Sequence, residues 1–135
     1  MNQDREQKPQ ERVEELSLAA PPVRFARLSY AWSGIITAWS EEAGFRNHVL
    51  GALAMVTTLV ILEPAMVWWG VALLCSALLL ALELINSAIE RVIDHIDGNL
   101  HPRIKAIKDM SAAAVVVASF GVFLLGIVMI ADTLA

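Results

Sequence analysis

Residues 65–90, AMVWWGVALLCSALLLALELINSAIE, decide the fold of this chain. No charge interrupts residues 65–82, and the stretch then continues through Glu83, Asn86 and Glu90. An uncharged run of this length predicts a membrane-spanning helix, and residues three or four positions apart share one helix face. The pattern therefore predicts a spanning helix whose end carries an acidic face. Carboxylates at the margin of a span are costly, so they indicate a functional site.

The composition supports a membrane protein. The 135 residues are 57% hydrophobic with a mean hydropathy of +0.60, which is too apolar for a soluble domain of this size. The net charge of −4 is small, half of it lies in the N-terminal tail, and it does not indicate a nucleic-acid partner. Residues 1–22 lack the apolar core of a secretory signal, so we expect a mobile cytosolic tail. The single cysteine, Cys75, excludes an intrachain disulfide.

The rest of the chain predicts an all-α membrane protein with three spans and one N-terminal surface helix. Apolar residues recur every three or four positions over about 23–43, which indicates an amphipathic helix in the membrane surface. Packing of that helix on a soluble core is the alternative. Uncharged runs over 49–62, 65–82 and 110–131 predict three spans. With their polar ends, these spans are expected over about 45–62, 65–96 including a cytosolic extension, and 108–132. Glu63-Pro64 predicts a tight turn, and residues 100–106 are expected to form a connection.

Basic residues set the predicted orientation. They precede the first span and surround the connection between the second and third spans, and they are Arg24, Arg27, Arg46, Arg91, Arg103, Lys105 and Lys108. The turn at Glu63-Pro64 has none. The positive-inside rule then places the N-terminus in the cytoplasm and the C-terminus in the periplasm. The acidic face is therefore expected at the cytosolic membrane edge, together with Glu42 and Lys108.

These polar groups suit phosphoryl transfer. Two carboxylates from different helices can hold Mg²⁺, which takes the rest of its ligands from water and phosphate oxygens. Glu83 lies nearest the apolar zone, where desolvation favours uptake of a proton, as a general base requires. A lysine such as Lys108 can neutralise phosphate charge, and positioning with charge neutralisation supplies most of the catalysis in this reaction class.

Simpler interpretations stay open for each residue taken alone. Glu83 and Glu90 can mark the point where the helix leaves the bilayer, and Asn86 can bond to a neighbouring helix. Lys108 can be a snorkelling anchor, and Asp109 can cap the third span. His48, His95 and His101 lack metal-ligand spacing and suit interfacial positions. No glycine-rich phosphate loop or kinase signature of the common nucleotide folds is present in the sequence.

Three segments together resemble one known family. They are Glu42-Ala-Gly-Phe-Arg46, Glu83-Leu-Ile-Asn-Ser-Ala-Ile-Glu90 and Lys108-Asp-Met110, and their order and spacing resemble the prokaryotic integral-membrane diacylglycerol kinase family from about Val23 to the C-terminus. The resemblance implies a homotrimer of three-span subunits with shared active sites in the bacterial inner membrane. It also implies a kinase domain over 23–135 that transfers the γ-phosphate of ATP to diacylglycerol and gives phosphatidic acid.

The resemblance also implies site residues, with Glu83 as the catalytic base and Glu42 and Glu90 as Mg²⁺ ligands. The implied ATP site comprises Tyr30, Glu42, Asn86, Glu90, Asn99, His101, Lys108 and Asp109. The implied lipid site comprises Arg27, Trp32, Trp39, Phe45, Arg46, His48, Glu83 and Ala112. The chain departs from the family pattern at His48, where an acidic residue is common, and in the phase of Arg24 and Arg27 before Tyr30.

Two other functions remain as alternatives. Undecaprenol kinase is the second enzymatic hypothesis, because the same catalytic groups can serve a different lipid tail. A small non-enzymatic membrane subunit, for assembly or as part of a metal-binding transporter, is the hypothesis from another class. No charged residue lies near the middle of any predicted span, which disfavours transport across the bilayer.

Overall fold

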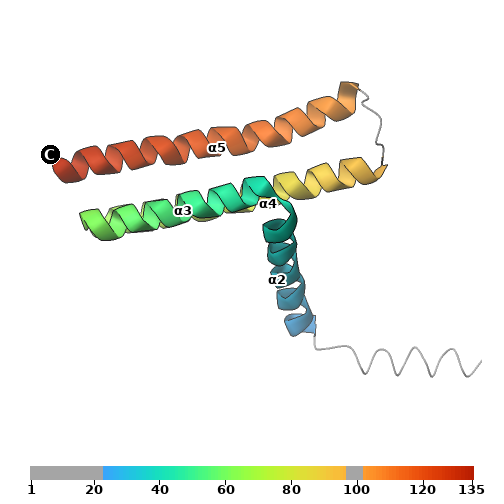
Figure 1. Ribbon diagram of the computed structural model, residues 1–135, viewed down its shortest axis with the longest axis horizontal. Helices are drawn as coiled ribbons and strands as arrows, with labels where there is room; N and C mark the ends of the chain where they lie inside the picture. The colour runs from blue at the N-terminus through green and yellow to red at the C-terminus, as the bar shows by residue number, and fades with distance from the viewer. Residues whose placement is uncertain (1–22, 97–101) are drawn as a thin grey trace, which may run out of the picture. The chain divides into compact units, whose positions relative to one another are not determined.

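The structure is a computed structural model that describes residues 23–96 and 102–135. The described residues form four α-helices: α2 (Val23–Glu41), α3 (Ala43–Leu62), α4 (Met66–Ile96) and α5 (Pro102–Leu134) (Figure 1). α3, α4 and α5 are each long and apolar enough to cross a membrane. The prediction of an all-α protein with three spans is therefore confirmed. The tail predicted over 1–22 and the loop residues Asn99 and His101 lie outside the described residues.

The chain divides after Ile36 into two units. The described part of the first unit is α2 from Val23 to Ile36. Its large apolar side chains are exposed, with Leu28 at 71% and Trp32 at 63%. Large exposed apolar side chains on a helix indicate contact with a membrane or another protein. The pattern agrees with the predicted surface helix.

In the second unit, α3 and α4 are joined by the predicted tight turn. Glu63 adopts the left-handed conformation (φ 47°, ψ 48°), and its N–H donates to the carbonyl of Leu59 at 3.0 Å, which satisfies one of the free carbonyls at the helix end. Pro64 follows and cannot continue the helix. α4 begins at Met66, so the two helices run antiparallel with almost no loop (Figure 1).

The buried core of the second unit lies near this turn and draws one residue from each of α3, α4 and α5. Leu59, Ala72 and Met129 are completely buried, and Met55, Trp68, Trp69 and Leu125 pack around them. Trp68 Nε1 donates to Asp132 Oδ2 at 2.9 Å and connects the start of α4 to the end of α5. α4 packs on both α3 and α5. The core therefore holds the three helices together at the end opposite the acidic face.

α4 and α5 extend beyond their apolar parts. α4 runs without a break from Met66 to Ile96, so the apolar run and the acidic face belong to one helix, as predicted. α5 begins at Pro102 rather than near residue 108, so the expectation of a connection over residues 100–106 is wrong from Pro102 onward. Proline suits the first position of a helix because its missing N–H has no helical partner there.

This earlier start also corrects one interpretation of Asp109. The residue lies well inside α5 and cannot be the N-cap of the helix. Its Oδ2 instead accepts a hydrogen bond from Lys105 Nζ at 2.6 Å, one turn earlier on the exposed surface. Such a pair of opposite charges four positions apart supports the first turns of a helix modestly.

Replacing Leu59 by alanine is expected to lower the free energy of unfolding by about 2–4 kcal/mol, because the cavity would lie between all three helices. Ile61→Ala is the matched control, since the Ile61 side chain is 73% exposed and its truncation removes few packing contacts within the chain. Denaturation in detergent micelles, followed by circular dichroism, measures both changes. Equal losses for the two variants would contradict the proposed core.

Candidate active site

The acidic face of α4 begins with Glu83, which is buried where α4 meets the first turns of α3. Glu83 is 7% exposed, and its Oε2 lies 3.6 Å from Nε2 of His48. A Cβ placed on Gly44 would overlap Oε1 of Glu83, so the glycine leaves the space that the carboxylate occupies. His48 and Gly44 are one helical turn apart. One face of α3 therefore encloses this carboxylate.

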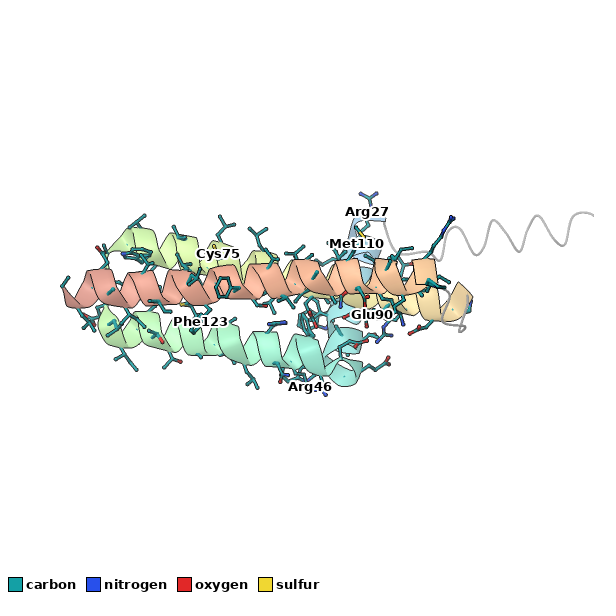
Figure 2. All side chains as sticks on the ribbon, turned by 90° about the horizontal axis from the view of Figure 1, so that it is seen from above. Arg27, Arg46, Cys75, Glu90, Met110 and Phe123 are labelled. Carbon is teal, nitrogen blue, oxygen red and sulfur yellow. The ribbon has the colours of Figure 1, made fainter. Side chains whose placement is uncertain are left out.

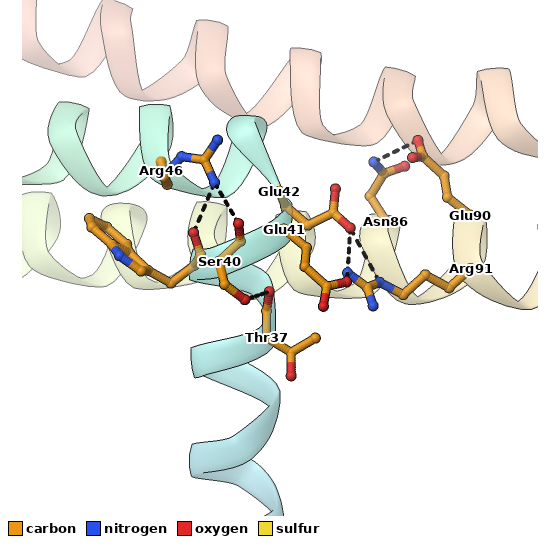
Figure 3. Close-up of polar contacts among 9 residues, drawn as sticks. Thr37, Ser40, Glu41, Glu42, Arg46, Asn86, Glu90 and Arg91 are labelled. Atoms are coloured by element: carbon orange, nitrogen blue, oxygen red, sulfur yellow. Dashed lines mark hydrogen bonds and ion pairs between the residues drawn. The ribbon is translucent and has the colours of Figure 1, made fainter.

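Asn86 and Glu90 form the next pair along α4. Asn86 Nδ2 donates to Glu90 Oε1 at 3.1 Å (Figure 3). Asn86 Oδ1 is buried and has no hydrogen-bond partner among the described residues. A buried acceptor without a partner costs roughly 1–3 kcal/mol, and native structures keep few such atoms. The oxygen is therefore available to a donor or a cation that binds beside Glu90.

Arg91 connects the other side of α4 to the break between α2 and α3. Its Nη2 lies 2.8 Å from Oε1 of Glu42 and 2.8 Å from Oε2 of Glu41, and its Nε also donates to Glu42 Oε1 at 3.2 Å (Figure 3). Glu42 has an extended backbone (φ −105°, ψ 112°) between the two helices. The break turns its carboxylate toward α4, where Arg91 holds it.

Arg46 stabilises the same break from the α3 side. Its Nη1 donates to the carbonyls of Trp39 at 2.9 Å and Ser40 at 3.3 Å, in the last turn of α2 (Figure 3). The last carbonyls of a helix have no helical partner and carry partial negative charge. The guanidinium therefore caps α2 and positions the chain that leads to Glu42.

The far end of α4 is connected to α5 by an ion pair. Lys108 Nζ lies 2.5 Å from Asp94 Oδ1. The Lys108 side chain is 34% exposed and that of Asp94 is 64% exposed, so the pair contributes at most about 1 kcal/mol to stability. Lys108 is therefore placed beside α4 at low energetic cost, where a stronger anion can compete for it.

An apolar cavity of about 350 Å³ lies among the three helices. His48, next to Glu83, is among its lining residues, and small residues create much of the space; these include Gly51, Ala52, Ser76, Ser119 and Gly126. Figure 2 shows that Phe123, another lining residue, and Cys75 lie farther from Glu90 along the helices than Arg46 does. His48 therefore lies both at the wall of this apolar cavity and beside the buried carboxylate of Glu83.

The oxygen atoms in this region fit a hard divalent cation better than a zinc ion. Glu42 and Glu90 offer carboxylates, and Asn86 offers the buried amide oxygen that lacks a partner. Within residues 23–96 and 102–135, no three His, Cys, Asp or Glu side chains are close enough to hold a metal by themselves. Mg²⁺ takes few protein carboxylates and completes its octahedron with water and phosphate oxygens.

Comparison with known proteins gives the family. Residues 29–130 match the family model described as prokaryotic diacylglycerol kinase. The chain belongs to this family. It is therefore a lipid kinase of a bacterial membrane, as the sequence resemblance predicts.

Relatives named diacylglycerol kinase and undecaprenol kinase each match about two thirds of this chain. The diacylglycerol kinase of Helicobacter pylori strain 26695 is 38% identical over 90 residues, which cover 67% of this chain and 70% of that protein. The diacylglycerol kinase of Escherichia coli K12 is 34% identical over 89 residues, covering 66% and 73%. The undecaprenol kinase of Bacillus subtilis is 33% identical over 93 residues, covering 69% and 76%.

In this family member, the structure brings several predicted residues into contact with one another or with residues beside them. Glu42 contacts Arg91, which follows Glu90 directly, while Asn86 contacts Glu90 and Lys108 contacts Asp94. Sequence reasoning missed two participants, Gly44 and the ion-pairing role of Arg91. Neither has a strong sequence signal, because both act across a helix–helix contact that only the folded chain creates.

The predicted lipid-site residues have mixed surroundings. Phe45 is 5% exposed and is buried within the chain, whereas Trp39 and Ala112 are exposed. Arg46 bonds to the end of α2. The other predicted positions on α2, Arg27, Tyr30 and Trp32, belong to the first unit and are exposed there.

An exchange of charges separates the two possible roles of Lys108. We expect Lys108→Asp and Asp94→Lys each to lose up to about 1 kcal/mol of stability, and the double exchange to recover most of it. If Lys108 also contacts ATP, the double exchange restores stability but leaves the KM for ATP raised about tenfold or more. Denaturation measures the stability of each variant, and steady-state kinetics measure its KM for ATP. Recovery of a normal KM would exclude nucleotide contact by Lys108.

Proposed function

We propose that this protein transfers the γ-phosphate of ATP to the hydroxyl of diacylglycerol and produces phosphatidic acid. The observation that carries the proposal is the surroundings of Glu83: a buried carboxylate beside His48, which lines an apolar cavity. A lipid has the matching shape, with one hydroxyl to present to the carboxylate and an apolar tail for the span. Relatives named diacylglycerol kinase support this acceptor.

In the proposed reaction, Glu83 accepts the proton of the acceptor hydroxyl. The hydroxyl oxygen forms a bond to the γ-phosphorus, and the bond from that phosphorus to the oxygen bridging to the β-phosphorus breaks. ADP leaves with the electron pair of the broken bond. General base catalysis of this kind typically contributes 10²–10⁴-fold, and the remaining acceleration comes from positioning and charge neutralisation.

The ATP site is proposed to use the oxygen atoms near the break between α2 and α3. Glu42 and Glu90 would hold Mg²⁺, and the unpartnered Asn86 Oδ1 would bind the cation or one of its waters. The bound Mg²⁺ would neutralise charge on the phosphates. Lys108 would exchange Asp94 for a phosphate oxygen. Tyr30, Asp109, Asn99 and His101 complete the proposed nucleotide contacts by family resemblance.

The lipid site is proposed to run along the surface helix and the first span. By family resemblance it would use Arg27, Trp32, Trp39, Phe45, Arg46, His48 and Ala112 with Glu83. The kinase domain would cover residues 23–135, with residues 1–22 as a cytosolic tail. The excess of basic residues near Glu42 and Lys108 supports a cytosolic position for this end and a periplasmic C-terminus.

A homotrimer with shared active sites completes the proposal. In the most apolar 18-residue stretch of each spanning helix, few residues are buried within one subunit. The buried share is 11% in α3, 22% in α4 and 11% in α5. Most of the apolar surface therefore faces lipid or other subunits. Small residues near the start of α5, including Ala112, Ala113 and Ala114, would allow close packing between helices.

Undecaprenol is the second candidate acceptor. The Bacillus subtilis undecaprenol kinase is about as similar to this chain as the diacylglycerol kinases are. An apolar cavity accepts an isoprenoid tail as well as an acyl tail, and the proposed chemistry at the hydroxyl is the same. The family match counts against the hypothesis of a non-enzymatic assembly subunit.

The deciding experiment uses the purified full chain in mixed micelles with Mg²⁺, labelled ATP and either lipid. We expect label in phosphatidic acid and a higher kcat/KM for diacylglycerol than for undecaprenol. Faster labelling of undecaprenol would make undecaprenol, and not diacylglycerol, the proposed acceptor. Label in neither lipid, from protein that is folded and oligomeric, would overturn the proposed function.

Glu83→Gln is expected to lower kcat by about 10²–10⁴-fold, because the amide cannot accept the proton. Glu63→Gln is the matched control, since Glu63 lies in the α3–α4 turn at the other end of the unit and should leave kcat unchanged. Steady-state kinetics in mixed micelles measure both variants. Turnover of Glu83→Gln within a few-fold of the parent protein would remove Glu83 from the role of base.

Glu42→Gln and Glu90→Gln are each expected to raise the Mg²⁺ concentration for half-maximal activity about tenfold or more, since each loses a charged ligand. Glu41→Gln is the control, because Glu41 also pairs with Arg91 but is not a proposed ligand. Titration of activity with Mg²⁺ at constant free ATP gives these values. The same midpoint in all three variants would argue against metal binding at Glu42 and Glu90.

A further inference from the structure

Glu83 has one neighbour whose position calls for a function. Among the described residues, His48 is the one cationic or cation-forming side chain within 4 Å of the Glu83 carboxylate, with Nε2 at 3.6 Å from Oε2. Glu83 keeps 9% of its side chain exposed, and His48 keeps 24%. A buried carboxylate without water depends on such neighbours for its orientation.

The two oxygens of Glu83 meet two residues of one helix face. Oε2 lies toward His48, and Oε1 occupies the space over Gly44, one turn earlier on α3. Both neighbours belong to the regular part of α3, which extends from Ala43 to Leu62. The carboxylate is thus restricted on one side by a ring nitrogen and on the other by backbone. This arrangement favours one orientation of the side chain.

An imidazole N–H can donate to a carboxylate and hold it in a productive direction. The observed separation exceeds a normal hydrogen bond, but hydrogen bonds at catalytic groups are often long before the substrate binds and shorten in its complex. His48 also lines the apolar cavity. It therefore stands between the proposed base and the space proposed for the acceptor's tail.

We propose that His48 is a positioning residue, which donates from Nε2 to Glu83 and directs the free oxygen of that carboxylate toward the acceptor hydroxyl. This inference rests on the proposed role of Glu83 as the base. It assigns His48 an effect on the chemical step, whereas the family resemblance implies only a lipid contact for this residue. A residue that acts only through Glu83 has no effect of its own when Glu83 is misplaced.

The test compares His48→Ala, His48→Gln and the control Asn47→Ala in the full-length protein. We expect His48→Ala to lower kcat about 10-fold or more with the KM values for ATP and lipid changed less than about threefold. His48→Gln keeps an N–H donor on a side chain of similar reach and should recover most of the loss. Asn47 is exposed and precedes His48, so its variant should behave as the parent protein.

A second comparison uses Glu83→Asp, whose shorter side chain withdraws the carboxylate from His48. In that background His48→Ala should lower kcat less than about twofold, because the residue that it positions is already misplaced. Independent effects of the two substitutions would overturn the proposal, and so would an effect of His48→Ala on lipid KM alone. Failure of Gln to recover activity would also overturn it.

The proposed function has a separate outcome. If the parent protein transfers no phosphate to either lipid, the proposed function fails before any variant is compared. If the parent protein is active and Glu83→Gln is inactive, but His48→Ala keeps a normal kcat, then only the role of His48 fails. Denaturation midpoints for all variants in the same detergent confirm that the compared proteins are folded.

Discussion

A carboxylate at the margin of a membrane span needs neighbours that replace the water it has lost, and Glu83 imposes this requirement on the fold. The first turns of α3 meet the requirement. Gly44 permits close approach, and His48 supplies a polar group beside the oxygen. α3 must therefore stay in close contact with α4, and the short turn through Glu63 and Pro64 joins the two helices with little freedom. Burial of Leu59, Ala72 and Met129 then stabilises the end nearest that turn.

The side chains of the long, uninterrupted α4 have different surroundings at different points along the helix. Near the apolar interior it carries the enclosed Glu83, and one to two turns later it carries Asn86 and Glu90 with an amide oxygen that has no partner. Further along, Arg91 and Asp94 bind groups from the neighbouring helices. Glu83, the proposed base, and Glu90, the proposed Mg²⁺ ligand on the same helix, therefore keep a constant spacing, because a helix is rigid over this length. This spacing is what phosphoryl transfer requires of its catalytic groups.

Ion pairs at this end of the unit position charged groups, although they contribute little to the stability of the fold. Arg91 holds Glu42 through partly exposed contacts, and Lys108 is held by an exposed carboxylate. Such pairs contribute little to stability because water competes for them. They nevertheless keep Glu42, from the break between α2 and α3, and Lys108, from α5, beside α4. A nucleotide with its cation can replace these partners without a large loss of folding free energy.

The sequence by itself determined the class of the protein and the position of its acidic face. The uncharged runs, the Glu63-Pro64 turn and the spacing of Glu83, Asn86 and Glu90 are local features, and local periodicity suffices to predict three spans and one polar helix face. The start of α5 was predicted too late, because Pro102 resembles a break in a sequence although it is well tolerated at the first turn of a helix. Asp109 was consequently open to interpretation as a cap.

Only the tertiary structure decided which residues touch. Gly44 carries no side chain and gives no chemical signal, yet its contact with α4 provides the space for Glu83. Arg91 looked like a marker of membrane orientation, and its bonds to Glu41 and Glu42 depend on how α3 packs against α4. The unpartnered oxygen of Asn86 likewise becomes visible only when its surroundings are known. The physical reason is the same in each case: residues far apart in sequence meet at a distance set by helix packing, which periodicity alone does not encode.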